Sequence, residues 1–224
     1  MKHEWYFNNV QNASADIITI PDTGSVGGLD LSNPALANKP TQSSIGTKIS
    51  YAADGVDDYL YKATTNFMKS MPTWMVTVVF KYDSSGDGIN QLLAASNESN
   101  TKPEGWLLYV NPTAIVIEDW NAAGTQGGIN RPFTFVNGQD YIITLAYNGT
   151  QSIFYAETTQ VGIGTITNPI SRPSQTDNVT TFARIRPAFG NFFRRGNIGY
   201  IGVDEFNLTR LNNNVATLKS TFGI

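Results

Sequence analysis

The sequence predicts an all-β protein built as an antiparallel β-sandwich, and three observations support this fold class. Short runs rich in Val, Ile, Tyr and Phe recur along the 224 residues, separated by turns of Gly, Pro, Asn and Asp. Helical periodicity is nearly absent. The clearest run, 141–155 (YIITLAYNGTQSIFY), alternates on both sides of Asn148-Gly149, which predicts a hairpin with a two-residue type I′ turn. Both faces of that hairpin are apolar, so we expect a sheet that is covered on both sides.

The length predicts one domain over residues 1–224, because β-sandwiches of this size are often undivided. Residues 1–44 are expected to supply a first strand and a long, turn-rich loop. Residues 45–210 are expected to form the main sandwich, and 211–224 a C-terminal tail.

Each predicted strand follows from a local pattern. The run 74–82 (WMVTVVFKY) is β-branched and aromatic throughout, which is typical of a central strand. Asp54-Gly55 divides 48–61 into two strands joined by a turn, and Asn111-Pro112 separates two more. The predicted strands, in chain order, are 4–10, the pair within 48–61, 74–82, 91–95, 105–110, 114–120, 131–136, the pair within 141–155, 158–166, 181–185 and 199–208.

The remaining segments are expected to be turns, loops and short helical pieces. Residues 121–130 (NAAGTQGGIN) predict a glycine-rich loop. A short helical turn is expected within 215–222, near the C-terminus, and another within 67–71.

Charge and composition exclude several classes of partner. The net charge is −3 and only 15% of residues are charged, so nucleic acid is not an expected partner. The chain has no cysteine, which excludes disulfides and thiolate metal sites. The start, MKHEWYFNNV, lacks the apolar core of a signal peptide, and runs such as MVTVVF are too short to cross a bilayer. We therefore expect neither signal-peptide export nor insertion into a membrane.

The order of these segments resembles that of a known fold family. The runs YAADGVDDYL, TWMVTVVFKY, QLLAASN, GWLLYV, YIITLAYNGTQSIFY and GNIGYIGVDEFNLTR follow one another as in the concanavalin A-like lectin/glucanase superfamily, in particular its laminin-G-like jelly rolls. The resemblance extends over roughly residues 45–210 and implies a jelly-roll sandwich. It also implies a structural role for Asp54, Asp57 and Asp58, at a turn between strands.

Catalytic patterns are missing from the sequence. Glycosidases that are similar in fold carry Glu-x-Asp-x-x-Glu on one strand, and no such spacing occurs here. Glu118 and Asp119 are adjacent, so in a strand their side chains point to opposite faces. His3 is the one histidine, which argues against a Ser-His-Asp triad or an imidazole-rich metal centre. We predict that the protein is not an enzyme.

No cofactor is predicted. Asp83, Ser85, Asp87 and Gly88 match the beginning of a calcium-binding loop, but position twelve would be Ala94 rather than Glu, so an EF-hand is excluded. Many laminin-G-like and lectin domains hold calcium through scattered Asp and Asn oxygens, which makes calcium an implication of the resemblance. The sequence does not place such a site.

Sugar binding requires an exposed aromatic ring that stacks on a pyranose, with polar side chains that pair with its hydroxyls. The candidate ligand-binding residues are Trp120, Asn121, Arg131, Trp106 and Tyr109. The alternative is that Trp106 and Trp120 are core aromatics.

The segment 186–197 (RPAFGNFFRRGN) combines aromatic and arginine side chains, which dominate the energetics of protein interfaces. The candidate protein-contact residues are Phe189, Phe192, Phe193, Arg194 and Arg195. The alternative is a strand with a basic turn before Gly196.

Three functions fit these observations. The first is a non-catalytic structural or recognition protein on the surface of a virus particle: a bacteriophage capsid-decoration, head-fibre or tail component, contacting other virion proteins or host-surface glycans, with a homo-oligomer as one form. This hypothesis rests on a low-charge, Asn/Thr/Gly-rich composition without a signal peptide. The second is an extracellular or bacterial cell-surface lectin or carbohydrate-binding module. The third, a glycoside hydrolase, ranks last because no carboxylate pair supports it.

Overall fold

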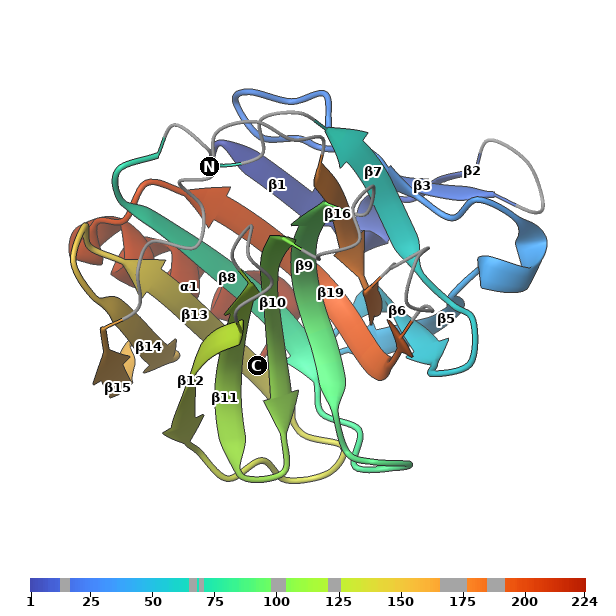
Figure 1. Ribbon diagram of the computed structural model, residues 1–224. Helices are drawn as coiled ribbons and strands as arrows, with labels where there is room; N and C mark the ends of the chain where they lie inside the picture. The colour runs from blue at the N-terminus through green and yellow to red at the C-terminus, as the bar shows by residue number, and fades with distance from the viewer. Residues whose placement is uncertain are drawn as a thin grey trace.

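The computed structural model describes residues 1–12, 17–64, 68, 71–97, 104–120, 126–165, 177–184 and 192–224. Within them, two antiparallel sheets face each other, and strands β9 to β11 of one sheet lie in front of β8 and β13 of the other (Figure 1). The all-β sandwich is confirmed. The single helix longer than one turn in this part of the chain, α1 (Leu208–Phe222), is too short and too polar to span a membrane.

The front sheet combines N-terminal strands, strands from the middle of the chain and one late strand, β16. Its strands, in spatial order, are β2 (Gln11–Asn12), β3 (Ile18–Ile20), β4 (Leu31–Ser32), β7 (Leu60–Thr64), β16 (Asp177–Thr181), β9 (Asn90–Asn97), β10 (Glu104–Asn111), β11 (Ala114–Trp120) and β12 (Gln126–Pro132). Two 3₁₀ turns, η1 (Phe7–Asn9) and η2 (Leu36–Asn38), lie between the early strands.

The back sheet contains the longest strands. In spatial order they are β5 (Thr41–Ile45), β6 (Lys48–Asp54), β19 (Arg195–Asp204), β8 (Trp74–Lys81), β13 (Asp140–Tyr147), β14 (Ser152–Ala156) and β15 (Thr159–Gly164). β1 (His3–Tyr6) continues the edge of β19 beyond β6. A single bridge between Arg195 and Asn90 joins the two sheets, and β17 (Ala183–Arg184) pairs with β18 (Phe192–Phe193) as a separate short hairpin.

The main core fills the space between the sheets. Trp74 and Phe80 of β8 are fully buried there, as are Leu145 of β13 and Leu108 of β10. Because successive side chains of a strand point to opposite faces, alternate residues of β10 and β13 reach this core. The prediction that 74–82 forms a central strand is confirmed, since β8 pairs with β13 on one side and β19 on the other.

The second face of the back sheet is covered by α1, which lies behind β8 and β13 in Figure 1. Its buried positions, spaced three or four residues apart, are Leu211, Val215, Leu218 and Phe222. They pack on sheet residues such as Val79 and Ile142. The prediction that the 141–155 hairpin is covered on both faces is therefore confirmed.

The helix is longer than the turn or two predicted within 215–222. Asn207 caps its N-terminus, with its side-chain oxygen accepting a hydrogen bond from the Arg210 amide at 3.1 Å. Gly223 ends it at φ 70°, a left-handed conformation that glycine adopts without strain. These two caps extend the helix over all 15 residues.

The predicted hairpin forms, but the predicted type I′ turn is wrong. Tyr147 pairs with Ser152, which leaves a four-residue connection, and only Gly149 has positive φ within it. The Asn148 side-chain oxygen accepts hydrogen bonds from the amides of Thr150 and Gln151. Asn148 therefore stabilises the turn through its side chain rather than through a left-handed backbone.

The boundaries around the predicted glycine-rich loop also differ. Residues 126–130 belong to β12, and the predicted strand 131–136 ends at Pro132. Gly128 pairs with Glu118, and a Cβ at this position would lie 2.9 Å from the Ile117 carbonyl oxygen. Glycine here therefore permits close pairing rather than a loop. Residues 121–125 lie outside the described residues.

The helical turn predicted within 67–71 falls mostly outside the described residues. Met68 and Met71, which the structure does describe, are buried in the main core.

Candidate functional site

Trp106 is a core residue, which corrects its prediction as a sugar-stacking platform. Its side chain is 3% exposed and stacks on Trp74, with ring centroids 6.5 Å apart and planes 17° apart. Successive side chains of β10 point to opposite faces, so Trp106 points inward and Tyr109 points outward. Large apolar side chains such as Trp106 fill the space between the sheets. The indole is therefore not available to a ligand.

Tyr109 lies on the outer face of the front sheet, opposite to Trp106. The Tyr109 hydroxyl donates a hydrogen bond of 2.7 Å to Oε1 of Glu118 on β11. The register of the hairpin explains this contact: Tyr109 pairs with Val116 and Glu118 pairs with Leu107, so the two side chains are diagonal neighbours on one face. α1 covers the other sheet, so no α-helix of the described chain lies over this pair.

The Tyr109–Glu118 pair lies within the electrostatic reach of Arg194. Burial raises the pKa of Tyr109 above its ordinary value, its hydrogen bond to Glu118 and the Glu118 charge raise it further, and the Arg194 charge lowers it. Arg194 is one-third exposed and forms an ion pair of 3.1 Å with Asp87. The outer face thus presents a fixed hydroxyl and a carboxylate, and the charge of the Arg194 guanidinium, which is paired with Asp87, acts on the Tyr109 hydroxyl.

Arg131 is not part of this face. It pairs with Ile115 on the core side of β12, and its side chain extends over β15. A Cβ at Gly162 would lie 2.4 Å from the Arg131 Cδ, so β15 makes room for this side chain by having glycine there. The buried Arg131 Nε has no hydrogen-bond partner in the structure. Arg131 therefore bridges the two sheets at their edge, away from Tyr109.

The other predicted contacts are only partly described. Trp120 lies in β11, opposite Gly105, but its side chain is outside the described residues, as are Asn121 and Phe189. Phe192 and Phe193 form β18, and their side chains are likewise not described. These five sugar and protein contacts stay predictions.

Arg195 is half-buried between two turns. A Cβ added at Gly55 would lie 2.9 Å from the Arg195 Cγ, and a Cβ added at Gly86 would lie 3.5 Å from the Arg195 Nε. The two adjacent arginines thus have different surroundings, with Arg194 near Asp87 and Arg195 between two turns.

The turn before β7 brings three carboxylates together. One oxygen from each of Asp54, Asp57 and Asp58 lies within 4.8 Å of the others. The structural role implied for these residues is supported by backbone contacts, since Asp58 accepts a hydrogen bond of 3.0 Å from the Asp54 amide. The Asp54 carboxylate accepts one of 2.8 Å from the Val56 amide. This cluster is the one place among the described residues where a cation could meet three acids.

Asp58 is expected to make stability depend on pH. Burial raises its pKa from 3.8 to about 6, and the charges of Asp54 and Asp57 add to the shift. The folded state then binds more protons than the unfolded state between about pH 4 and 6, so the free energy of unfolding falls as pH rises through this window. Asp58→Asn keeps the acceptor for the Asp54 amide and should raise stability at pH 7.5 by about 1–2 kcal/mol, allowing for solvent screening.

Urea denaturation of both proteins at pH 4.5 and 7.5 measures this effect. The variant should lose most of the difference between the two pH values, and an unchanged difference would show that Asp58 is not its source.

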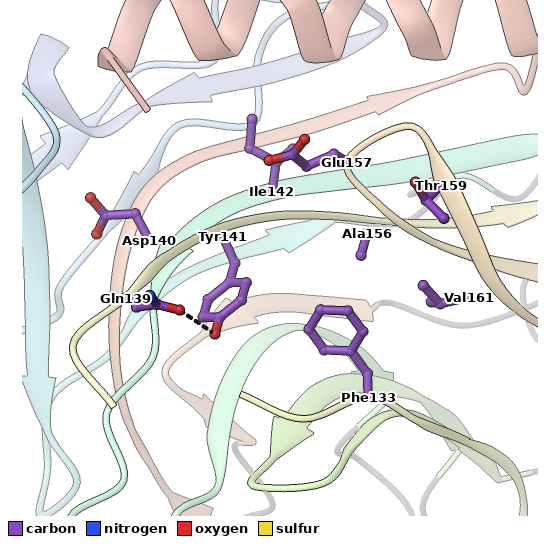
Figure 2. A pocket seen from close by; sticks show the side chains of 9 residues that line it. All are labelled: Phe133, Gln139, Asp140, Tyr141, Ile142, Ala156, Glu157, Thr159 and Val161. Atoms are coloured by element: carbon purple, nitrogen blue, oxygen red, sulfur yellow. Dashed lines mark hydrogen bonds between the residues drawn. The ribbon is translucent and has the colours of Figure 1, made fainter. Parts of the chain in front are cut away.

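A groove of about 570 Å³ opens at one end of the sandwich, beside the β14–β15 turn (Figure 2). Its lining consists of Phe133, Gln139, Asp140, Tyr141, Ile142, Ala156, Glu157, Thr159 and Val161. The rings of Phe133 and Tyr141 are 6.0 Å apart and nearly perpendicular, at 84°. In Figure 2 the Gln139 amide lies beside the Tyr141 hydroxyl, whereas the Asp140 and Glu157 carboxylates point away from the two rings.

Neither the binding role of Glu118 nor the groove was predicted from the sequence. The position of Glu118 could have been predicted from the sequence. The turn after Asn111 sets the register of the hairpin, and that register places Glu118 diagonally from Tyr109. No comparable signal existed for the groove. Its residues come from a loop and three strands, and the path of that loop is set by tertiary contacts.

Comparison with known proteins identifies the fold. No protein-family profile matches the chain, and no curated protein matches it. The CBM40 of the Ruminococcus gnavus IT-sialidase, solved bound to α2,3-sialyllactose, superposes with a TM-score of 0.56 at 16% identity, covering 79% of this chain and 96% of that one. The receptor binding domain of botulinum neurotoxin D gives a TM-score of 0.64 at 8% identity, covering 96% of this chain and 52% of that one.

A partial likeness to an enzyme also occurs. The NanB sialidase of Streptococcus pneumoniae gives a TM-score of 0.55 at 17% identity, and the match covers 67% of this chain but 26% of that one. The chain thus spans about a quarter of the sialidase and about half of the neurotoxin domain. At such identities the likeness concerns the fold alone: the chain is a concanavalin A-like β-sandwich of the jelly-roll kind.

Proposed function

We propose that the protein is a non-catalytic, lectin-like domain that binds an acidic glycan on the outer face of its front sheet. The observation that carries this proposal is the Tyr109–Glu118 hydrogen bond within reach of the Arg194 charge. The CBM40 neighbour, solved with sialyllactose, supports the choice of an acidic sugar.

The three side chains have complementary roles in this proposal. Arg194 supplies a guanidinium that can pair with a sugar carboxylate in bidentate geometry. Glu118 accepts hydrogen bonds from sugar hydroxyls, and the half-buried Tyr109 ring offers an apolar surface. The sequence also predicts Trp120 as an aromatic platform, and its backbone lies on β11, two residues beyond Glu118.

The same geometry supports binding rather than catalysis. The raised pKa of Tyr109 keeps its hydroxyl protonated at neutral pH, so it is a hydrogen-bond donor and not a nucleophile. Glycoside hydrolysis needs two carboxyl groups about 5–10 Å apart on either side of the scissile bond. Of the described acids near the proposed sugar, Asp87 pairs with Arg194, and only Glu118 is placed against the sugar hydroxyls.

Arg194→Ala should weaken binding of α2,3-sialyllactose by about 10–100-fold, the usual effect of losing a charge-assisted hydrogen bond. Isothermal titration calorimetry measures the change. Tyr109→Phe, which removes only the hydroxyl, should weaken binding less.

Arg195→Ala is the matched control, since it removes the neighbouring arginine that packs between two turns. Its affinity should stay within about twofold of the parent. Equal losses in both arginine variants, or tight binding in Arg194→Ala, would contradict the proposed site.

The setting on a bacteriophage particle stays a prediction from composition, and the oligomeric state and the single-domain boundaries also stay predictions. The neighbours in structure support the alternative of an extracellular or cell-surface lectin better than the virion setting. Mass spectrometry of purified virions tests the first setting, and absence of the chain from them would favour the second.

A further inference from the structure

We propose that the groove of Figure 2 is a second binding site, and that it takes an uncharged pyranose residue of a glycan. This inference goes beyond the proposed function, because the groove lies on other elements than Tyr109, Glu118 and Arg194. Its volume of about 570 Å³ falls within the range of small-ligand sites, roughly 300–1,000 Å³.

The floor of the groove is apolar and aromatic. Phe133 and Tyr141 are both partly exposed, and their perpendicular rings form a corner in which a planar apolar face can rest. Val161 and Ala156 extend this surface toward β15. The C–H face of a pyranose has the matching shape and polarity.

The rim is polar but electrically balanced. The Asp140 carboxylate lies 3.6 Å from the Lys81 ammonium, and the Glu157 carboxylate lies 2.9 Å from the Lys219 ammonium. A charged ligand would have to compete with these ion pairs. An uncharged sugar can instead pair its hydroxyls with the Gln139 amide and the Thr159 hydroxyl, without competing for the two carboxylates.

The groove is held in place before any ligand arrives. The Tyr141 hydroxyl accepts a hydrogen bond of 2.8 Å from the Val136 amide and donates one of 3.1 Å to Gln139. The main-chain carbonyl of Gln139 accepts a hydrogen bond of 3.0 Å from the Tyr82 amide, which connects the loop to the end of β8. A rigid site loses little conformational entropy on binding.

The opposite wall is fixed as well. Glu157 adopts φ 52°, a left-handed conformation that is unfavourable for a residue with a Cβ. Its amide donates a hydrogen bond of 2.8 Å to the Ile142 carbonyl, and its carboxylate pairs with α1. These contacts hold the β14–β15 turn, which forms this wall of the groove, in place.

Titration of ¹⁵N-labelled protein with lactose, followed by NMR, tests the site. Lactose should shift the amides of Gln139, Thr159 and Val161 in a saturable manner. Glucosamine, which is cationic, and glucuronic acid, which is anionic, should shift them at least tenfold more weakly at equal concentration.

Thr159→Trp fills the groove from an exposed rim position and should weaken lactose binding at least tenfold. The matched control is Gln160→Trp, which adds the same bulk at the next exposed residue of β15, outside the groove lining. It should bind within twofold of the parent. If Thr159→Trp does not fold, Gln139→Ala should still weaken binding about threefold.

Arg194→Ala separates this inference from the proposed function. It should abolish the response to sialyllactose at Tyr109 and leave the lactose shifts in the groove unchanged. Lactose shifts confined to the Tyr109 face, no lactose shifts at all, or a stronger response to glucosamine would overturn the second site, whatever the outcome for sialyllactose.

Discussion

Trp106→Ala is expected to destabilise the protein by about 3–5 kcal/mol, the usual cost of removing a large buried aromatic side chain. The indole is 3% exposed and stacks on Trp74, which in turn stacks on Tyr147. Its removal leaves a cavity between the sheets that the flanking strands cannot close without breaking their ladders.

Chemical denaturation measures this loss, and glycan affinity measured on the folded fraction should be unchanged. Leu107→Ala serves as control, because Leu107 is the next residue on the half-exposed outer face. Its cost should be below about 1.5 kcal/mol. A variant at Trp106 that keeps its melting temperature but loses sugar binding would restore the ligand-contact hypothesis.

Phe222→Ala should cost a similar amount, about 3–5 kcal/mol, by loosening α1 from the back sheet. The Phe222 ring is fully buried, and it packs so closely on β19 that a Cβ at Gly199 would lie 2.6 Å from it. The absence of a side chain at Gly199 therefore leaves the space that the Phe222 ring fills.

Hydrogen exchange should report the same loss locally, with faster exchange along α1 than along β10 and β11. Leu208→Ala is the control in the same helix, since that side chain is 52% exposed, and its effect should stay within about 0.5 kcal/mol. Equal effects of the two variants would mean that α1 is not docked through Phe222.

The fold was largely predictable from the sequence, because strand period and turn residues are local signals. The central strand β8 and the turn at Gly55 follow from such signals, and both are confirmed. The length of α1 was underestimated because its N-cap, Asn207, directly follows a strand-like run. Gly127 and Gly128 resemble a loop in sequence, yet pair with β11, because close strand contact also selects glycine.

The candidate sites were less predictable. Tyr109 was identified from its residue type, whereas Arg194, assigned to a protein contact, lies within charge range of it. Tyr109 lies on β10 and Arg194 directly precedes β19, some 85 positions later in the chain, so no local pattern connects them. Arg131 was predicted as a sugar contact, but it lies on the core side of β12, and its position over β15 depends on how the two sheets close.

The place of β19 has a consequence for synthesis of the chain. β19 fills the gap between β6 and β8, so an interior strand of the back sheet is made after all of its neighbours. Until Asp204 has left the ribosome, β8 carries an unpaired edge of mostly apolar residues, which can pair with another nascent chain. The protein should therefore depend on chaperones while it is being translated, and fragments that stop before Arg195 should aggregate rather than fold.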